Sequence, residues 1–355
     1  MQNKIVIIAI ITTIINSNAL ELINANTNSN KFENGTVVST LSGNVEFLWN
    51  ETRIFSDKTI WKRGEGHLLM SGNIKVLRNK QELKCDFAEF RSKGKVLQLK
   101  GKVFAVDTNY CATMTAGTAD YFINNDSVFL TKCPKIYFWD SISTDTFTIA
   151  GNIMNYTSKT GIARAADSVK INGADFVSFA DSGYYFADDK KGMLTGNPRI
   201  EYENSSVKGD TIHILFGETS LNEFFVIGNP VANSSEDENG DSTFMELIGD
   251  TLRFLIQDQK ISQILSEKNS SFKRFKKDKE DVADKMQGER ILTFLNNKDI
   301  ENYKMLSIVE GNAKAIYFDQ KTKNESSGDT LKLFFDDDGV NKIIILGKVK
   351  GRVEE

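Results

Sequence analysis

Apolar and polar residues alternate along much of the chain, in segments that follow a recurring four-residue mark. The mark reads Gly-Asp-Thr and then Ile or Leu at residues 209–212, 249–252 and 328–331, and a degraded copy, Gly-Glu-Arg-Ile, stands at 288–291. The alternating positions after the four marks are Ile212, Ile214 and Phe216; Leu252, Phe254 and Ile256; Ile291, Thr293 and Leu295; and Leu331, Leu333 and Phe335. Because alternation places every second side chain on one face, the pattern predicts a β-strand after each mark.

The marks recur at a nearly constant spacing. Their acidic residues stand at 210, 250, 289 and 329, in steps of 40, 39 and 40 residues. A second mark, Gly-x-Val or Gly-x-Ile, precedes other alternating segments at 43–45, 72–74 and 101–103, with steps of 29 residues. The amino-terminal half carries weaker versions of the acidic mark around Asp57, Asp86, Asn152 and Asp181. A fixed period of this size indicates one supersecondary unit stacked on copies of itself.

Each unit is expected to hold two strands joined by short turns, which forces antiparallel pairing. The composition agrees with an all-β protein, since 24 Phe and 9 Tyr stand against 3 Pro. The acidic stretch 233–242 and the densely charged stretch 268–290 break the pattern. Both are expected to be loops inserted at unit corners. The second is basic at 273–277, which suits either contact with anionic headgroups or a partner, or a solvated loop.

Charge and motif content argue against several functional classes. The 44 basic and 48 acidic residues nearly balance, so nucleic acid is not expected as a partner. The two histidines are far apart, and the sequence has none of the common hydrolase, metalloprotease or phosphate-loop motifs. One Asp per repeat does not supply the 6–8 oxygens that calcium takes. We therefore expect no enzyme, no cofactor and no metal, and we expect His213 to point outward, opposite Ile212 and Ile214.

The first residues are typical of a secretory signal peptide. Lys4 precedes an apolar run at 5–15, Ser17-Asn18-Ala19 offers a small-x-small cleavage site, and Ala25 offers a later one. The run is shorter than the roughly 20 residues that a membrane span needs. A buried strand or a retained anchor is the alternative interpretation. Cleavage after residue 19 would place the mature chain outside the cytoplasm.

The cysteines offer no disulfide framework because their number is odd. Cys85, Cys111 and Cys133 are expected to be buried thiols in strands, although an oxidising compartment would allow one pair to bridge.

The apolar rows are the candidate binding surface. Large aromatic residues in the rows, and an opposite face that is not uniformly polar, favour a sheet folded over a long apolar interior. Acyl chains would suit such a space, since each buried CH₂ contributes about 0.8 kcal/mol. Periodicity alone does not separate a dry core from a lipid-filled one. The groove candidates are Phe90, Tyr156, Tyr185, Ile212, Ile214, Phe216, Leu252, Phe254, Ile256, Leu331, Leu333 and Phe335.

The paired marks resemble those of the OstA/LptA-like family. They stand here as Gly209-Asp210-Thr211-Ile212 followed by Ile227-Gly228-Asn229, and as Gly328-Asp329-Thr330-Leu331 followed by Leu346-Gly347-Lys348-Val349. The resemblance runs from about Gly35 to Val353. It implies a repetitive antiparallel β-jellyroll, or β-taco, whose strands fold into a V around an open apolar groove. It also implies a periplasmic protein that binds lipopolysaccharide or a related glycolipid and belongs to a bridge from inner to outer membrane.

In that family the edges of the sheet would pair with other β-taco transport proteins or with a second copy, and residues 349–353 would form one such edge. This chain is longer than the minimal bridge protein, which implies either one groove with more rungs or two tacos in tandem. The expected organisation is a signal peptide at 1–19, repeats at 30–232, and further repeats with charged loop insertions at 233–353. The alternative function is a structural or adhesive secreted β-solenoid with a dry core and no lipid ligand.

Overall fold

The computed structural model is built almost entirely from β-strands. It describes residues 20–49, 52–78, 80–91, 96–108, 112–122, 127–139, 146–157, 160–186, 189–217, 221–238, 241–277, 279–295, 303–319, 322–336 and 339–354. The expected signal peptide at 1–19 and Cys111 lie outside these residues. Every strand pair recorded for the described part is antiparallel, so the predicted all-β antiparallel class is confirmed.

Compactness divides the chain into two units. Unit 1 holds residues 1–174 and 182–190, and unit 2 holds 175–181 and 191–355. The strands of unit 1 are β1 (Glu21–Asn24), β2 (Thr27–Glu33), β3 (Thr36–Trp49), β4 (Thr52–Lys62), β5 (His67–Arg78), β6 (Gln81–Arg91), β7 (Val96–Asp107), β8 (Ala112–Phe122), β9 (Ser127–Thr131), β10 (Lys135–Trp139), β11 (Thr146–Ala150), β12 (Ile153–Thr157) and β13 (Ile162–Asn172), with a short 3-10 helix, η2, at Arg63–Glu65. Strand β14 (Phe176–Phe186) contributes residues to both units.

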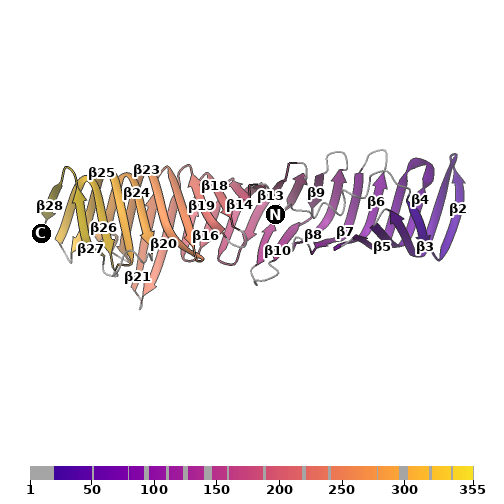
Figure 1. The fold of residues 1–355 in the computed structure, drawn as a ribbon, viewed down its shortest axis with the longest axis horizontal. Helices are drawn as coiled ribbons and strands as arrows, with labels where there is room; N and C mark the ends of the chain where they lie inside the picture. Colours follow the sequence, from indigo (N-terminus) through magenta and orange to yellow (C-terminus); the bar gives the residue numbers. More distant parts are fainter. Residues whose placement is uncertain are drawn as a thin grey trace. The chain divides into compact units, whose positions relative to one another are not determined.

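The strands of unit 2 follow one another as successive arrows (Figure 1). They are β15 (Lys191–Thr195), β16 (Arg199–Tyr202), β17 (Ser205–Lys208), β18 (Thr211–Phe216), β19 (Leu221–Ile227), β20 (Val231–Glu238), β21 (Asp241–Ile248), β22 (Thr251–Gln257), β23 (Lys260–Lys276), β24 (Asp284–Leu295), β25 (Met305–Asp319), β26 (Thr322–Phe335), β27 (Val340–Leu346) and β28 (Lys350–Glu354), with the 3-10 helix η3 at Glu280–Val282. The sequence predicts a boundary between two groups of repeats at residues 232 and 233. This boundary remains a prediction, because a division of the chain into compact units does not show where groups of repeats meet.

Long strands bend sharply at the second mark. In β3 the bend lies at Gly43-Asn44, where both residues have positive φ (75° and 48°) and the register with β4 shifts between Ser42 and Val45. The leg before the bend pairs with β2, and the leg after it pairs with β1. The two legs therefore belong to two sheets that meet along a ridge. Glycine suits the bend because it adopts positive φ without a steric penalty.

The two sequence marks meet at this ridge. The amide of Asn73, in the bend of β5, donates a hydrogen bond of 2.9 Å to the Asp57 carboxylate in β4. A Cβ atom added at Gly72 would overlap that same carboxylate. The acidic mark of one strand thus packs against the Gly-Asn mark of the next, and this contact explains why both marks share one period.

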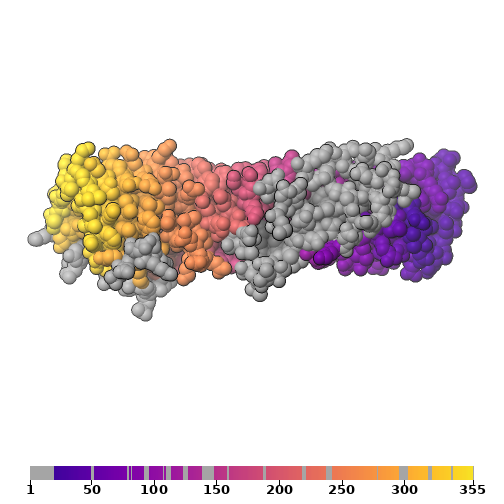
Figure 2. Space-filling model, in the orientation of Figure 1, coloured from indigo at the N-terminus to yellow at the C-terminus, as the bar shows by residue number. Residues whose placement is uncertain are grey.

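Unit 2 likewise consists of two sheets joined at a ridge. Sheet I contains β16, β17, β20, β21, residues 271–276 of β23, 284–287 of β24, 313–319 of β25, 322–327 of β26, and β28. Sheet II contains β15, β18, β19, β22, residues 260–267 of β23, 290–295 of β24, 305–310 of β25, 330–335 of β26, and β27. The outer faces of these strands contribute to the pink-to-yellow surface in Figure 2.

The structure corrects several expectations. Most of the stretch at 233–242 forms the hairpin β20–β21, which projects beyond the neighbouring strands (Figure 1), and most of 268–290 lies in β23 and β24. The charge of these two stretches suggested loops, but the charged side chains lie on strand faces that contact solvent or other polar side chains. Two acidic marks, at 288–291 and 328–331, lie inside β24 and β26 rather than at strand starts, because those strands continue through the ridge.

The cysteine expectation holds for one of the two described thiols. Cys85 is a buried free thiol in β6, and burial, followed by the negative charge of Asp86, raises its pKa to about 12. Cys133 is exposed, so the expectation of a buried thiol was wrong there. It occupies a ridge bend with φ 59°, next to Lys132 with φ 62°, and a bend at the ridge faces solvent.

Candidate functional site

The twelve groove candidates point mainly into the interior between the sheets. Nine of them are buried: Tyr156, Ile212, Ile214, Leu252, Phe254, Ile256, Leu331, Leu333 and Phe335. The other three, Phe90, Tyr185 and Phe216, are partly exposed. Their inward orientation follows from the alternation, but contact with a lipid stays a prediction for all twelve.

Close to the ridge, the inner rows of unit 2 are tightly packed. In sheet II, Ile212 lies opposite Val226, which lies opposite Leu252, and all three are fully buried. One step further from the ridge, the rings of Phe224 and Phe254 stack with centroids 4.5 Å apart. Aromatic pairs at this separation are favourable contacts. The ridge side of unit 2 is therefore an ordinary close-packed core.

Farther from the ridge, sheets I and II line an open cavity of about 840 Å³. This volume lies in the range of small-molecule pockets, roughly 300–1,000 Å³. Apolar side chains from both sheets form its walls, and polar and charged side chains form its rim. The apolar wall consists of Ala232, Met245, Leu247, Phe254, Ile261, Ile264, Phe272, Leu295, Met305 and Phe335. The charged rim consists of Glu203, Glu236, Lys260, Arg274, Lys276, Lys304 and Asp336.

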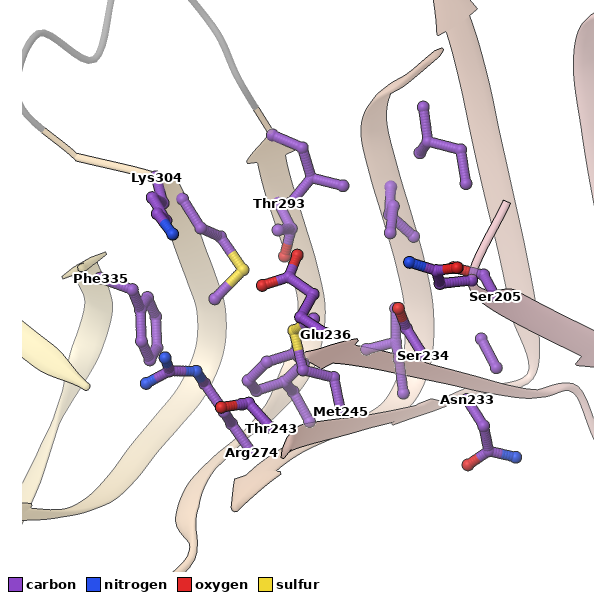
Figure 3. A pocket seen from close by; sticks show the side chains of 18 of the residues that line it. Ser205, Asn233, Ser234, Glu236, Thr243, Met245, Arg274, Thr293, Lys304 and Phe335 are labelled. Carbon is purple, nitrogen blue, oxygen red and sulfur yellow. The ribbon is translucent and has the colours of Figure 1, made fainter. Parts of the chain in front are cut away.

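Figure 3 shows how these side chains are arranged. Arg274 lies beside Phe335 on one side of the space, and Ser205 lies on the other side. Glu236 and Met245 project between them from the β20–β21 hairpin. The hairpin thus extends one wall of the cavity beyond the neighbouring strands. Its polar residues, such as Glu236 and Thr243, therefore line the outer part of the cavity.

A buried acid–base pair borders the cavity. Arg274 donates a hydrogen bond of 3.1 Å to the backbone oxygen of Asp336, and its guanidinium lies 4.0 Å from the Asp284 carboxylate. Burial raises the pKa of Asp284 to about 6, while the backbone N–H of Phe318, at 3.2 Å, and the charge of Arg274 oppose that rise. Gly339 lies over the pair, where a Cβ would come within 3.3 Å of the carboxylate.

A second polar contact crosses the interior between the sheets. The hydroxyl of Tyr202, in β16 of sheet I, donates a hydrogen bond of 2.9 Å to the backbone oxygen of Gln259, in the β22–β23 turn of sheet II. Tyr202 is 2% exposed. Burial, followed by the charges of Asp175 and Glu203, raises the pKa of its hydroxyl to about 12, so it stays protonated and able to donate.

Sequence reasoning missed Tyr202, Arg274, Phe272 and Asp284. Arg274 and Asp284 fall in the charged stretch that was expected to be a loop. Hydrophobic alternation does not reveal a cation that faces inward, because the pattern treats every polar position as outward. The available signal was the alternation of Phe272, Arg274 and Lys276, which places these three residues on one face of a strand. All three line the cavity.

The two histidines lie in different surroundings. His67 contacts Glu89 at 3.0 Å, whereas His213, opposite Ile212 and Ile214 as expected, stacks on Phe225 with centroids 4.6 Å apart. Within the described ranges, no group of three or more His, Cys, Asp or Glu side chains is arranged to hold a metal ion. Among the same residues, no helix has the length and apolar character to cross a membrane.

Comparison with known proteins gives a family match and likenesses to solved structures. Residues 22–218 match the family described as LptA/(LptD N-terminal domain) LPS transport protein. The matched residues extend through β18 of unit 2. No curated protein matches the sequence.

One of the similar solved structures is LptH from Pseudomonas aeruginosa, described as the LptA homologous periplasmic component of the conserved lipopolysaccharide transport device. The two share 16% sequence identity, with a TM-score of 0.31, over 34% of this chain and 92% of LptH.

Proposed function

Because the chain belongs to the LptA/(LptD N-terminal domain) LPS transport protein family, we propose that it binds lipopolysaccharide or a related glycolipid in the periplasm. It would form part of a bridge that carries the glycolipid from the inner to the outer membrane. Acyl chains would lie between the sheets, and the sugars and phosphates would stay outside. Such transfer requires binding and release, and no catalytic group or cofactor.

The observation that supports this proposal most is the cavity of about 840 Å³ between sheets I and II. A chain of about ten buried CH₂ groups would contribute roughly 8 kcal/mol of transfer free energy, before the costs of association. Phe254, Phe272 and Phe335 provide apolar walls for such a chain. The rim adds Lys260, Lys276 and Lys304, which suit phosphate or carboxylate groups of a glycolipid.

The experiment that tests this proposal is site-specific photo-crosslinking in the cell. Phe254 lies in the cavity wall and is 1% exposed, whereas its neighbour Arg253 faces outward and pairs with Glu223. Photoreactive benzoylphenylalanine at each position gives two variants that carry the same probe on opposite faces of strand β22. We expect lipopolysaccharide adducts at position 254 and none at 253. Equal labelling at the two positions, or none at either, would contradict the proposal.

The exposed sheet edges support the expected partners. All residues of β2 are exposed, and Phe32 within it is 80% exposed. At the other end of the sequence, Val349 and Val353 are 60% and 63% exposed, next to and within β28. Open edges with apolar side chains favour pairing with another strand. A second copy or another β-taco protein would supply that strand.

The alternative function keeps the same fold without a lipid. It is favoured by the close-packed rows near the ridge, where Ile212, Leu252 and Leu331 are fully buried. Under this reading the chain is a structural or adhesive secreted β-solenoid. The crosslinking experiment separates the two functions, because a dry core would give no lipid adduct at position 254.

A further inference from the structure

Two hydrogen bonds cross from one sheet of unit 2 to the other beside the cavity. The first joins Tyr202 in sheet I to the backbone oxygen of Gln259, in the turn between strands β22 and β23 of sheet II, at 2.9 Å. The second joins Arg274 in sheet I to the backbone oxygen of Asp336, which directly follows strand β26 of sheet II, at 3.1 Å. Both link the sheets on the side away from the ridge, where the polypeptide itself does not join them.

The strand order places the cavity between these two contacts. In sheet I, β17, β20 and β21 lie between Tyr202 on β16 and Arg274 on β23. Those intervening strands contribute Ser205, Glu236 and Met245 to the cavity lining. Four strand steps correspond to about 19 Å. The cavity therefore faces an opening that has a contact between the sheets at each end.

The two contacts differ in strength. The Tyr202–Gln259 bond joins two neutral groups. The Arg274 bond is charge-assisted, and the guanidinium also lies 4.0 Å from the Asp284 carboxylate and 5.8 Å from the centre of the Phe335 ring. Charge-assisted hydrogen bonds are about twice as strong as neutral ones. The Tyr202 contact is thus the weaker of the two.

We propose that this opening is a lateral port through which an amphiphile with an acyl chain and an anionic head enters or leaves the cavity of unit 2, and that the Tyr202–Gln259 contact is the clasp that opens to admit it. The Arg274–Asp336 contact is the fixed end of the port. This inference rests on the proposed function, because it assigns a route to the ligand that the cavity holds.

A clasp affects rates more than affinity. Opening is required for both association and dissociation, so a weaker clasp speeds both steps and leaves their ratio nearly unchanged. The loss of one neutral hydrogen bond shifts an equilibrium by about 2- to 12-fold. A clasp variant is therefore expected to change both rate constants by a factor in this range.

The test uses the full chain, Tyr202→Phe, and 11-(dansylamino)undecanoic acid as a fluorescent amphiphile. Tyr202→Phe removes the donor and keeps the ring. In stopped-flow measurements we expect association and dissociation to be about 2- to 12-fold faster, with the Kd within about twofold of the wild type. Tyr137→Phe is the matched control, because Tyr137 lies on β10 of unit 1 and is 37% exposed. It should leave both rate constants unchanged.

A reversible lock provides the second measurement. Glu203 and Lys260 are exposed rim residues next to the two clasp residues. In a chain whose three native cysteines are replaced by alanine, Glu203→Cys and Lys260→Cys can be bridged with dithio-bis-maleimidoethane. We expect the bridge to slow probe uptake more than tenfold, and reduction of the linker to restore it.

The outcomes separate the port from the proposed function. Probe binding with rates that neither Tyr202→Phe nor the bridge alters would overturn the port and leave the amphiphile site standing. No probe binding by the wild-type chain would overturn both. A Tyr202→Phe variant that fails to fold leaves the bridged variant to decide, since an unchanged uptake rate across the bridge overturns the port.

Discussion

The side-chain amide of Asn73 donates a hydrogen bond of 2.9 Å to the carboxylate of Asp57, and this contact sets the geometry of a ridge bend. The same relationship joins Asn197 to Asp181 at 3.4 Å, Asn229 to Asp210 at 3.2 Å, and Asn269 to Asp250 at 3.0 Å. At the last ridge bend along the sequence the amide is replaced by an ammonium group, since Lys348 lies 3.7 Å from Asp329. At Asn152 and Asp167 the two residue types exchange places, with the contact kept at 3.1 Å.

This ladder assigns the repeated aspartates a structural role. The carboxylates of Asp57, Asp181, Asp210 and Asp250 accept a hydrogen bond from the neighbouring bend. In several bends the backbone N–H of the aspartate also bonds across, as in Asp210 to the oxygen of Gly228 at 2.8 Å. An exposed hydrogen bond contributes about 1 kcal/mol or less. The ladder therefore specifies where strands bend and how they align, while the apolar rows supply the bulk of the stability.

Gly72→Ala should destabilise the chain, because Gly72 has φ 76° and a Cβ there overlaps Asp57. Left-handed backbone costs an alanine roughly 1–2 kcal/mol, and the overlap adds to it. We expect a loss of about 2 kcal/mol or more in urea unfolding. Adding Asp57→Gly should recover the overlap part, because it removes both the carboxylate and the Cβ of Asp57. Gly351→Ala is the control, since its nearest neighbour would be 3.7 Å away, and it should change stability by less than about 0.5 kcal/mol. Equal effects at the two glycines would refute the ridge argument.

Asp284→Asn should flatten the pH dependence of stability. The pKa of Asp284 is raised from 3.8 to about 6, so between these values the native state holds a proton that the unfolded chain has lost. Stability therefore falls as pH rises through this window, by an amount on the order of 3 kcal/mol. Urea unfolding at pH 4, 5, 6 and 7 should show this decline in the wild type and much less of it in Asp284→Asn. Asp258→Asn, in the exposed β22–β23 turn, should behave like the wild type. An unchanged pH profile in Asp284→Asn would exclude burial of this carboxyl.

Met245→Trp should weaken amphiphile binding by filling the cavity. Met245 lines the cavity from β21, whereas the adjacent Phe244 faces away and stacks on Phe275 with centroids 5.6 Å apart. We expect about a tenfold rise in the Kd for the dansyl fatty acid when Met245 is replaced, because the larger ring takes the place of several buried CH₂ groups. Phe244→Trp changes the other face of the same strand and should leave the Kd unaltered. The opposite order of effects would place the ligand outside the cavity.

Val349→Lys with Val353→Lys should reduce association through the carboxyl-terminal edge. Both valines are exposed, and lysine on a sheet edge discourages strand pairing. Sedimentation velocity over a range of concentrations should show less self-association, or less binding to a β-taco partner, than the wild type. Ile227→Lys is the comparison, since Ile227 is 43% exposed and its strand β19 is paired on both sides. If self-association or partner binding is unchanged in the double variant, the interface does not involve the carboxyl-terminal edge.

Several features of the fold could be predicted from residues alone. Alternation after Gly249-Asp250-Thr251 places Leu252, Phe254 and Ile256 inward because the side-chain period of a strand is two. The shared spacing of the two marks correctly indicated a stacked antiparallel repeat. The charged stretch after Lys268 misled the prediction because Arg274 and Lys276 face the interior, where pattern reasoning expects apolar residues.

The residues alone are enough to predict the strand periodicity, the repeat and the faces that turn inward, because these depend on local backbone preference and on alternation. The folded chain was needed to show that Asp57 meets Asn73, that Tyr202 reaches Gln259, and that sheets I and II are far enough apart to leave a cavity. Those features depend on distances between segments that local preferences do not encode. A gap between two sheets arises from how their strands splay away from the ridge, and side chains distant in the sequence determine that splay.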